Sequence, residues 1–119
     1  MSPDCLDNPV WQYYPRHRHA TREDWDNKIP HKRSAERGGL SKYNPYLFGS
    51  DEEVSELEMR CHRTGVLIEF REAHYLYVGL VVGVCSGDET EYVFAECSSG
   101  FVHGRPISIT ALKKMGVEV

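Results

Sequence analysis

Two residues near the end of the chain, His103 and Arg105, have types and spacing that could support chemistry. They lie in the segment FVHGRPISI, which follows a Ser-Ser-Gly turn and is typical of a strand. Because residues i and i+2 of a strand point to the same face, the imidazole and the guanidinium would stand side by side. An imidazole moves protons near neutral pH, and a guanidinium holds a phosphate with paired hydrogen bonds. The pair therefore suits catalysis on a phosphodiester, and Gly104 between them would let a substrate backbone approach.

The same pattern has a simpler interpretation. A one-sided antiparallel sheet turns polar residues outward at every second position, so His103 and Arg105 could face solvent with no specific role. If the pair does act on a substrate, we expect Thr90 and Tyr92 to help bind it. These two residues would share a face of the preceding strand, and both carry hydroxyl donors.

A second candidate cluster, His31 with Lys32 and Arg33, follows Pro30 in the basic part of the chain. We expect His31 to act as a third catalytic residue opposite the sheet, and Lys32 and Arg33 to bind the substrate. The alternative is a solvated basic helix end. The sequence contains no metal-ligand spacing, phosphate loop or dinucleotide fingerprint. We therefore expect neither a metal nor a cofactor, and in particular no nucleotide cofactor.

Charge is distributed unevenly along the 119 residues, whose net charge is −4. Residues 1–50 carry a balance of +2, and residues 51–119 carry a balance of −6. Proteins that bind nucleic acid usually present a basic surface. The overall acidity counts against non-specific binding to nucleic acid, so any basic surface must come from the N-terminal half.

The elements that must position these residues begin with helices. A short helix is predicted after Thr21, an N-cap residue, and a second between Pro30 and the Gly38-Gly39 pair. The clearest helix starts after Ser50, which forms a capping box with Glu53. Its apolar stripe consists of Val54, Leu57 and Cys61, and Gly65 ends it.

From Gly65 onward the chain is typical of strands. Residues 75–85 are predicted to form one glycine-punctuated central strand that bends or bulges. The predicted fold class is α+β, with N-terminal short helices followed by an antiparallel sheet of about four strands, which could be strongly bent or a barrel-like meander. Residues 1–20 are expected to form an irregular arm, and 21–119 a single domain.

The cysteines and the apolar segments bear on location. None of Cys5, Cys61, Cys85 and Cys97 forms a Cys-x-x-Cys pair, so we expect free thiols in a reducing cytoplasm. The longest apolar run is too short to span a bilayer, and no secretion signal is visible. The sequence thus favours a cytoplasmic site of action, no membrane association, and RNA or a protein as the partner.

The order of parts, with the closing segment SSGFVHGRPIS, resembles the small ribonuclease domains of bacterial polymorphic toxins, many of which share a barnase/RelE-like layout. The resemblance covers roughly residues 25–110. It implies a metal-independent ribonuclease in which His103 and Arg105 match the strand-borne catalytic positions. His31 or Lys32 would match the helix-borne position. The acidic balance departs from that family, whose members are often basic.

A second resemblance implies binding instead of catalysis. The segment from Gly65 to Leu112 is similar to an SH3-like small barrel, in which a glycine-rich second strand bends to close the sheet. The acidic balance would also suit an immunity-type inhibitor that covers a basic nuclease by charge complementarity. Both interpretations stay open at the level of sequence.

Overall fold

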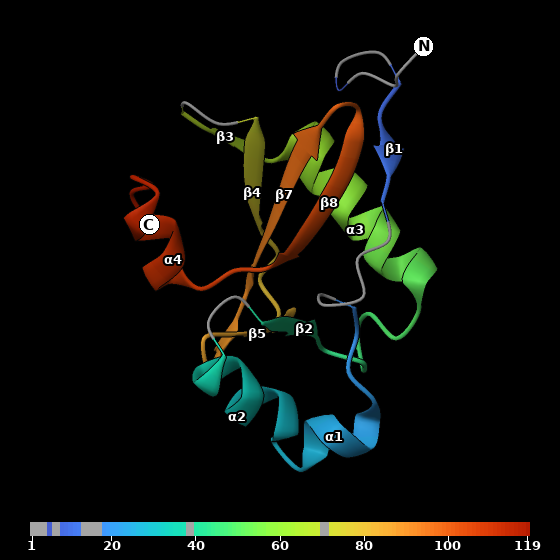
Figure 1. Cartoon of the computed structure of the whole chain (residues 1–119), viewed down its shortest axis with the longest axis vertical. Coiled ribbons are helices and arrows are strands. Elements are labelled where there is room, and N and C mark those ends of the chain that lie inside the picture. Colours follow the sequence, from blue (N-terminus) through green and yellow to red (C-terminus); the bar gives the residue numbers. More distant parts are fainter. Residues whose placement is uncertain (1–4, 6–7, 13–17, 38–39, 70–71) are drawn as a thin grey trace.

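Two open β-sheets and four helices make up the fold (Figure 1) of the computed structural model, which describes residues 5, 8–12, 18–37, 40–69 and 72–119. The predicted α+β class is confirmed, whereas a closed barrel is not formed by the described strands. The helices are α1 (Arg22–Asp26), α2 (Ile29–Glu36), α3 (Asp51–Thr64) and α4 (Ile109–Lys114). The strands are β1 (Val10–Trp11), β2 (Ser41–Tyr43), β3 (Val66–Ile68), β4 (Ala73–Tyr77), β5 (Gly83–Cys85), β6 (Asp88–Thr90), β7 (Tyr92–Ser98) and β8 (Phe101–Pro106).

The larger sheet has the order β1-β8-β7-β4-β3. Strands β3, β4, β7 and β8 pair antiparallel, as predicted, and β1 adds a parallel edge. The N-terminal part of the chain, expected to be irregular, therefore contributes a short strand. The smaller sheet, with order β2-β5-β6, was not predicted.

The expectation of one central strand over residues 75–85 is wrong. The chain leaves the larger sheet after β4 and enters the smaller sheet at β5. Gly79, with φ +85°, lies in the connection, and this left-handed conformation interrupts an extended strand. The glycines that suggested a bend within one strand thus mark a change of sheet.

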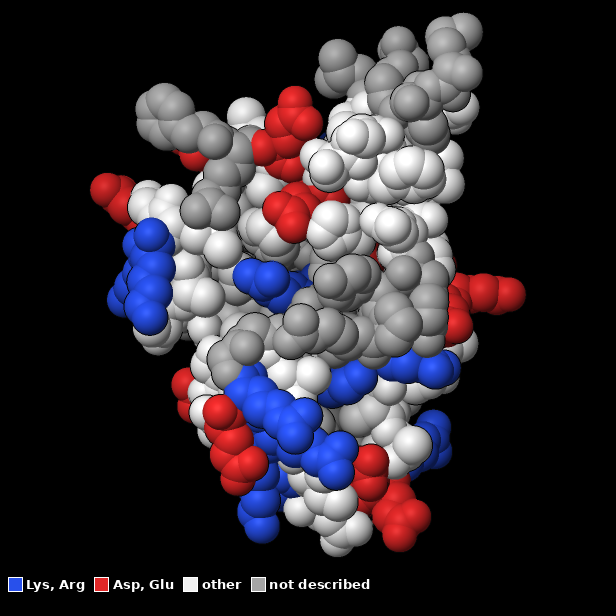
Figure 2. Space-filling view, viewed as in Figure 1, with Lys and Arg blue, Asp and Glu red and all other residues white. Residues whose placement is uncertain are grey.

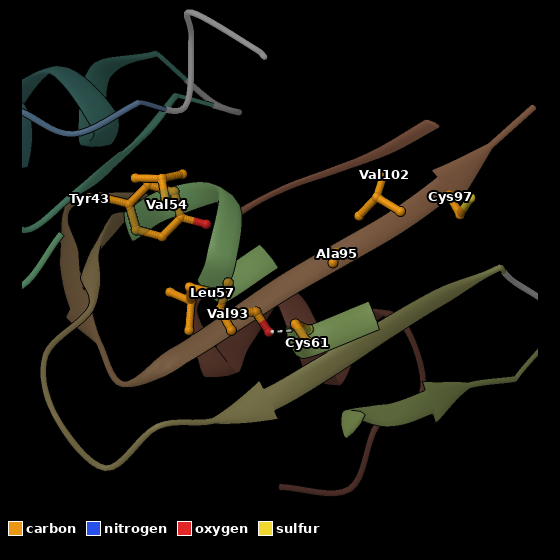
Figure 3. Packing of buried hydrophobic residues seen from close by; sticks show 8 residues of the cluster. All are labelled: Tyr43, Val54, Leu57, Cys61, Val93, Ala95, Cys97 and Val102. Carbon is orange, nitrogen blue, oxygen red and sulfur yellow. Dashed lines mark hydrogen bonds between the residues drawn. The ribbon is translucent and has the colours of Figure 1, made fainter. Parts of the chain in front are cut away.

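Helix α3 covers one face of the larger sheet, and its packing forms the main core (Figure 3). Val54, Leu57 and Cys61 face the sheet at the predicted spacing of three and four. The Cys61 thiol donates to the Val93 carbonyl at 3.6 Å. The buried members of this core are Tyr43, Val54, Leu57, Cys61, Val93, Ala95, Cys97 and Val102.

The opposite face of the sheet is partly covered by α4. Ile107 and Leu112 pack there against Phe94, Ala73 and Ile68. The larger sheet is therefore a middle layer between α3 and α4. None of the helices in the described residues is long and apolar enough to cross a membrane.

Ser50 caps α3 as the sequence predicted. Its hydroxyl accepts from the Glu53 N–H at 3.2 Å and donates to the Glu53 carboxylate at 3.0 Å. We expect Ser50→Ala to lower the free energy of unfolding by about 1 kcal/mol, because the N–H group loses its partner. Urea titration followed by circular dichroism measures this loss. Ser55→Ala, within the same helix, is the control, and an equal loss in both variants would contradict a capping role.

A disulfide joins Cys5 to Cys97 across 92 positions of the sequence. The expectation of four free thiols is therefore wrong for this pair, whereas Cys61 and Cys85 are free and buried. Such spacing carries no pattern that a sequence reveals, since the two cysteines meet only when the N-terminal segment lies along the sheet. Disulfides of this kind persist mainly in oxidising compartments.

Helices α1 and α2 pack against the smaller sheet. Trp25 and Ala20 bury their side chains against Val84 of β5. The buried Ser34 hydroxyl accepts from the Gly87 N–H at 2.9 Å, which ties α2 to the β5–β6 turn. This packing fixes α2 relative to β2, and it creates the concave surface described below.

Candidate functional site

His103 and Arg105 share one face of β8. They are half-buried, whereas Val102 and Gly104 are buried toward α3, and Pro106 is buried beside Gly83 of β5. In the register of the sheet, His103 is opposite Glu96 and Arg105 is opposite Phe94 of β7. The predicted common face is thus present, and it lies on the side of the sheet that carries α4.

His103 is paired with a carboxylate that the sequence interpretation did not include. Its Nε2 lies 2.9 Å from Oε1 of Glu96, and both side chains are partly accessible to solvent. A carboxylate at this distance orients the imidazole ring by accepting a hydrogen bond from it. The pair can therefore give and take a proton at an accessible surface.

Arg105 lies beside this pair and stacks on an aromatic ring. Its Cζ is 5.1 Å from the centre of the Phe94 ring, which holds the guanidinium over the sheet. Phe94 itself is buried, but further aromatic rings lie on the same face, because Tyr75 is opposite Phe94 and the exposed Tyr77 is opposite Tyr92. Aromatic rings of this kind can stack on nucleic-acid bases.

Gly104 is not the approach point for a substrate that the sequence suggested. Its missing side chain faces α3, where a Cβ would stand 2.2 Å from the Phe94 carbonyl oxygen and 3.1 Å from the Glu58 side chain. The glycine therefore admits Glu58 to the underside of β8.

Glu58 is a buried carboxyl with several donors. It accepts from the Tyr43 hydroxyl at 2.7 Å and from the Trp11 indole N–H at 2.8 Å. Burial raises its pKa to about 7, while hydrogen bonds from Tyr43, Trp11 and the Gly104 backbone oppose that rise. Because Glu58 and His103 lie on opposite faces of the sheet, Glu58 does not belong to the accessible surface.

His31 lies elsewhere. It packs on Trp25, with ring centres 4.8 Å apart, and its Nε2 is 3.1 Å from the Glu89 carboxylate of β6. This hydrogen bond is the main cause that lowers the pKa of Glu89. Helix α2 lies at the opposite end of the molecule from the β7–β8 turn, next to which His103 is found (Figure 1). His31 therefore pairs with Glu89 and His103 pairs with Glu96, and the structure does not bring the two histidines together.

The predicted substrate-binding residues also separate. Thr90 is buried and donates its hydroxyl to the Ile107 carbonyl at 2.6 Å, so it has a structural role. It ends β6, whereas Tyr92 begins β7 in the other sheet, and the expected common strand face does not exist. Lys32 is exposed on α2, and Arg33 lines a pocket.

That pocket is a concavity of about 710 Å³ between residues 18–22, α2, β2 and the loop that follows β2. Figure 2 shows Lys and Arg side chains gathered over α2. The cations come from three separate stretches of the sequence, so no local sequence motif predicts that they line one pocket. The charged lining residues are Arg18, Arg22, Asp24, Arg33, Arg37 and Lys42.

No protein-family model matches this chain, and neither a curated protein nor a solved structure is significantly similar to it. Among the described residues, no group of three or more His, Cys, Asp or Glu is placed to hold a metal ion. Function must therefore be inferred from the geometry of the chain's own side chains.

Glu96 could have been found from the sequence. The two-residue loop Ser99-Gly100 has φ +53° and +82°, the left-handed pair that a tight hairpin requires. Counting back from that loop places Ser98 opposite Phe101 and Glu96 opposite His103. The Ser-Ser-Gly turn therefore sets the register of the hairpin, and this register predicts that His103 lies opposite Glu96.

Proposed function

We propose that the chain is a metal-independent, toxin-like ribonuclease that acts at the face of β7 and β8 that carries His103, Glu96 and Arg105. The observation that carries the proposal is the 2.9 Å contact between His103 Nε2 and Glu96, with Arg105 on the same face. An acid, a base and a cation are the groups that phosphodiester transfer to a ribose 2′-oxygen requires. All three are side chains of this face.

In the proposed reaction, the Glu96 carboxylate takes the proton of the ribose 2′-hydroxyl. The 2′-oxygen attacks phosphorus, and the bond from phosphorus to the 5′-oxygen breaks. Protonated His103 gives its proton to the leaving 5′-oxygen, and Arg105 stabilises the negative charge that develops on phosphorus-bound oxygens. The proton then passes from Glu96 to His103 across their 2.9 Å contact, which restores both groups.

Cleavage of a fluorogenic RNA oligonucleotide by the purified chain, in excess chelator, tests this proposal. We expect His103→Ala to lower kcat/KM by about 10²- to 10⁴-fold, and Arg105→Gln by about 10²-fold, because each removes a group acting in the transition state. His74→Gln is the matched control, since His74 lies in the same sheet and is paired with Ala95 on the α3 face. Circular dichroism establishes that every variant is folded.

Two results would contradict the ribonuclease proposal. One is intact RNA after incubation with folded wild-type protein, and the other is an equal loss of activity in His74→Gln and His103→Ala. For a toxin, induced wild-type protein should also arrest bacterial growth, with cleaved RNA inside the cells. If RNA is the substrate, the protein would act in the cytoplasm. The Cys5–Cys97 disulfide would suit a chain that crosses an oxidising compartment before it reaches that cytoplasm.

A second candidate function is binding to a basic protein, as an inhibitor of the immunity type does. It is favoured by a concavity of about 350 Å³ whose lining includes Asp88, Glu89 and Glu91 beside the exposed Ile109. Carboxylates around an apolar residue suit a cationic partner surface. Folded wild-type protein that leaves RNA intact would favour this alternative.

A further inference from the structure

The charge of the 710 Å³ pocket is unbalanced. Among the described residues that line it, five side chains are cationic and Asp24 is the single carboxylate. Arg18 has a carboxylate partner in Asp51, at 3.8 Å and with both groups about half exposed, a geometry that contributes little. Within the part of the chain that the structure describes, no carboxylate comes within ion-pair distance of Arg33 or Arg37. The pocket is therefore electropositive.

Lys42 lines the same pocket and is partly buried. Burial lowers its pKa, and the like charges of Arg18 and Arg33 lower it further. Cations gathered around one pocket repel one another when the pocket is empty. An anion that enters the pocket relieves the repulsion, so the arrangement favours binding of a negatively charged group.

Arg33 and Arg37 are placed to hold one anion together. Arg33 lies in the last turn of α2, and Arg37 is the C-cap residue, whose N–H donates to the Arg33 carbonyl at 2.9 Å. Both line the pocket and are exposed. Two guanidinium groups that line one pocket match the several acceptor oxygens of a phosphate better than they match a single carbonyl or hydroxyl group.

The remaining wall of the pocket is apolar. Ile29, Pro30, Leu40 and Pro45 line it beside the cations. A ligand that fills the pocket thus needs an anionic part and an apolar part, and a concavity of this size accommodates a molecule of a few hundred daltons. A nucleoside phosphate has both parts, because its base is flat and its phosphate is charged.

We propose that this pocket binds a nucleoside phosphate unit, either a free nucleotide or one unit of an RNA strand. Arg33 and Arg37 hold the phosphate, and the base or sugar packs against Ile29 and Leu40. The choice of nucleotide rests on the proposed ribonuclease function, in which the pocket would anchor RNA away from the His103 face. An acidic peptide is the competing occupant, and the test below separates the two.

The experiment measures fluorescence anisotropy of a labelled 2′-O-methyl RNA octamer, which lacks the attacking hydroxyl and so reports binding alone. We expect Arg33→Gln/Arg37→Gln to weaken Kd at least tenfold at about 50 mM salt, because two phosphate contacts are lost. The slope of log K against log salt should fall by about 1. Lys113→Gln/Lys114→Gln on α4 removes the same charge at another surface, and should leave Kd within about twofold. Thermal unfolding of both variants establishes that they remain folded.

Competition identifies the source of the ligand. Displacement of the octamer by AMP supports a free nucleotide, and binding of the octamer without competition from AMP supports a strand. Equal weakening in the two double variants, no binding of the octamer, or displacement by a polyglutamate peptide but by neither nucleotide nor phosphate would overturn the inference.

The two proposals fail in different ways. If RNA is cleaved, and Arg33→Gln/Arg37→Gln binds and cleaves like wild type, the pocket inference is wrong while the ribonuclease proposal stands. If wild-type protein binds the octamer through the pocket but leaves natural RNA intact, the ribonuclease proposal fails while the pocket inference stands.

Discussion

The free energy of unfolding should fall as the pH is raised from about 4.5 to above 7, and Glu58 should cause most of this fall. Burial raises the pKa of Glu58 in the folded protein from an ordinary 4.5 to about 7. A raised pKa means that the folded state binds the proton more tightly than the unfolded state does. The stabilisation is therefore complete below pH 4.5 and is lost as the pH rises through 7, by on the order of 3 kcal/mol.

Glu58→Gln tests this prediction, because an amide resembles the protonated carboxyl at every pH. The Tyr43 hydroxyl can accept from an amide as readily as it donates to a carboxylate, so the hydrogen-bonded cluster is retained. Urea unfolding between pH 5 and 8 should show a smaller pH dependence in Glu58→Gln than in wild type. Glu56→Gln, exposed on the same helix, should retain the wild-type dependence. Parallel curves for wild type and Glu58→Gln would rule out Glu58 as the cause.

Loss of the Cys5–Cys97 disulfide should lower the free energy of unfolding by about 4 kcal/mol. The bond closes a loop of 92 positions, and a loop this long restricts the unfolded chain strongly. Cys5→Ser is the better substitution, since Cys5 is half-buried whereas Cys97 is buried in the core. Urea titration of wild type with and without reductant, beside Cys5→Ser, measures the effect.

Reductant should lower the stability of wild type to that of Cys5→Ser and should leave the variant unchanged. This second comparison removes any general effect of the reductant. A wild type that is indifferent to reductant, or two free thiols at these positions by mass spectrometry of protein purified without reductant, would contradict the prediction.

Helix α3 shows how much local pattern can determine. Ser50 caps the first turn by accepting a hydrogen bond from a backbone N–H, and Gly65 ends the helix. The apolar stripe of Val54, Leu57 and Cys61 determines which face is buried. Each of these signals acts within a few residues, so it needs no knowledge of the rest of the chain. The common face of His103 and Arg105 was predictable for the same reason, because strand alternation is also local.

Glu58 shows where local pattern misleads. On the sequence it is one of several acids in a polar helix, and its position after Leu57 gives no sign of burial. It is buried because Gly104 leaves space above it and because Tyr43 and Trp11 supply donors from distant segments. The cost of burying a carboxyl is met by groups that only the fold brings near.

The sequence by itself determined the α+β class, the caps and faces of the longest helix, and an imidazole and a guanidinium on one strand face. Tertiary structure alone decided that His31 lies far from His103, that Thr90 is buried, that the N-terminal segment is tied to β7 by a disulfide, and that five cations line one pocket. The physical reason is the distance along the chain between the residues that interact. Turns, caps and alternation depend on neighbours along the chain, whereas burial, ion pairing and pocket charge depend on segments that meet only after the sheets have formed.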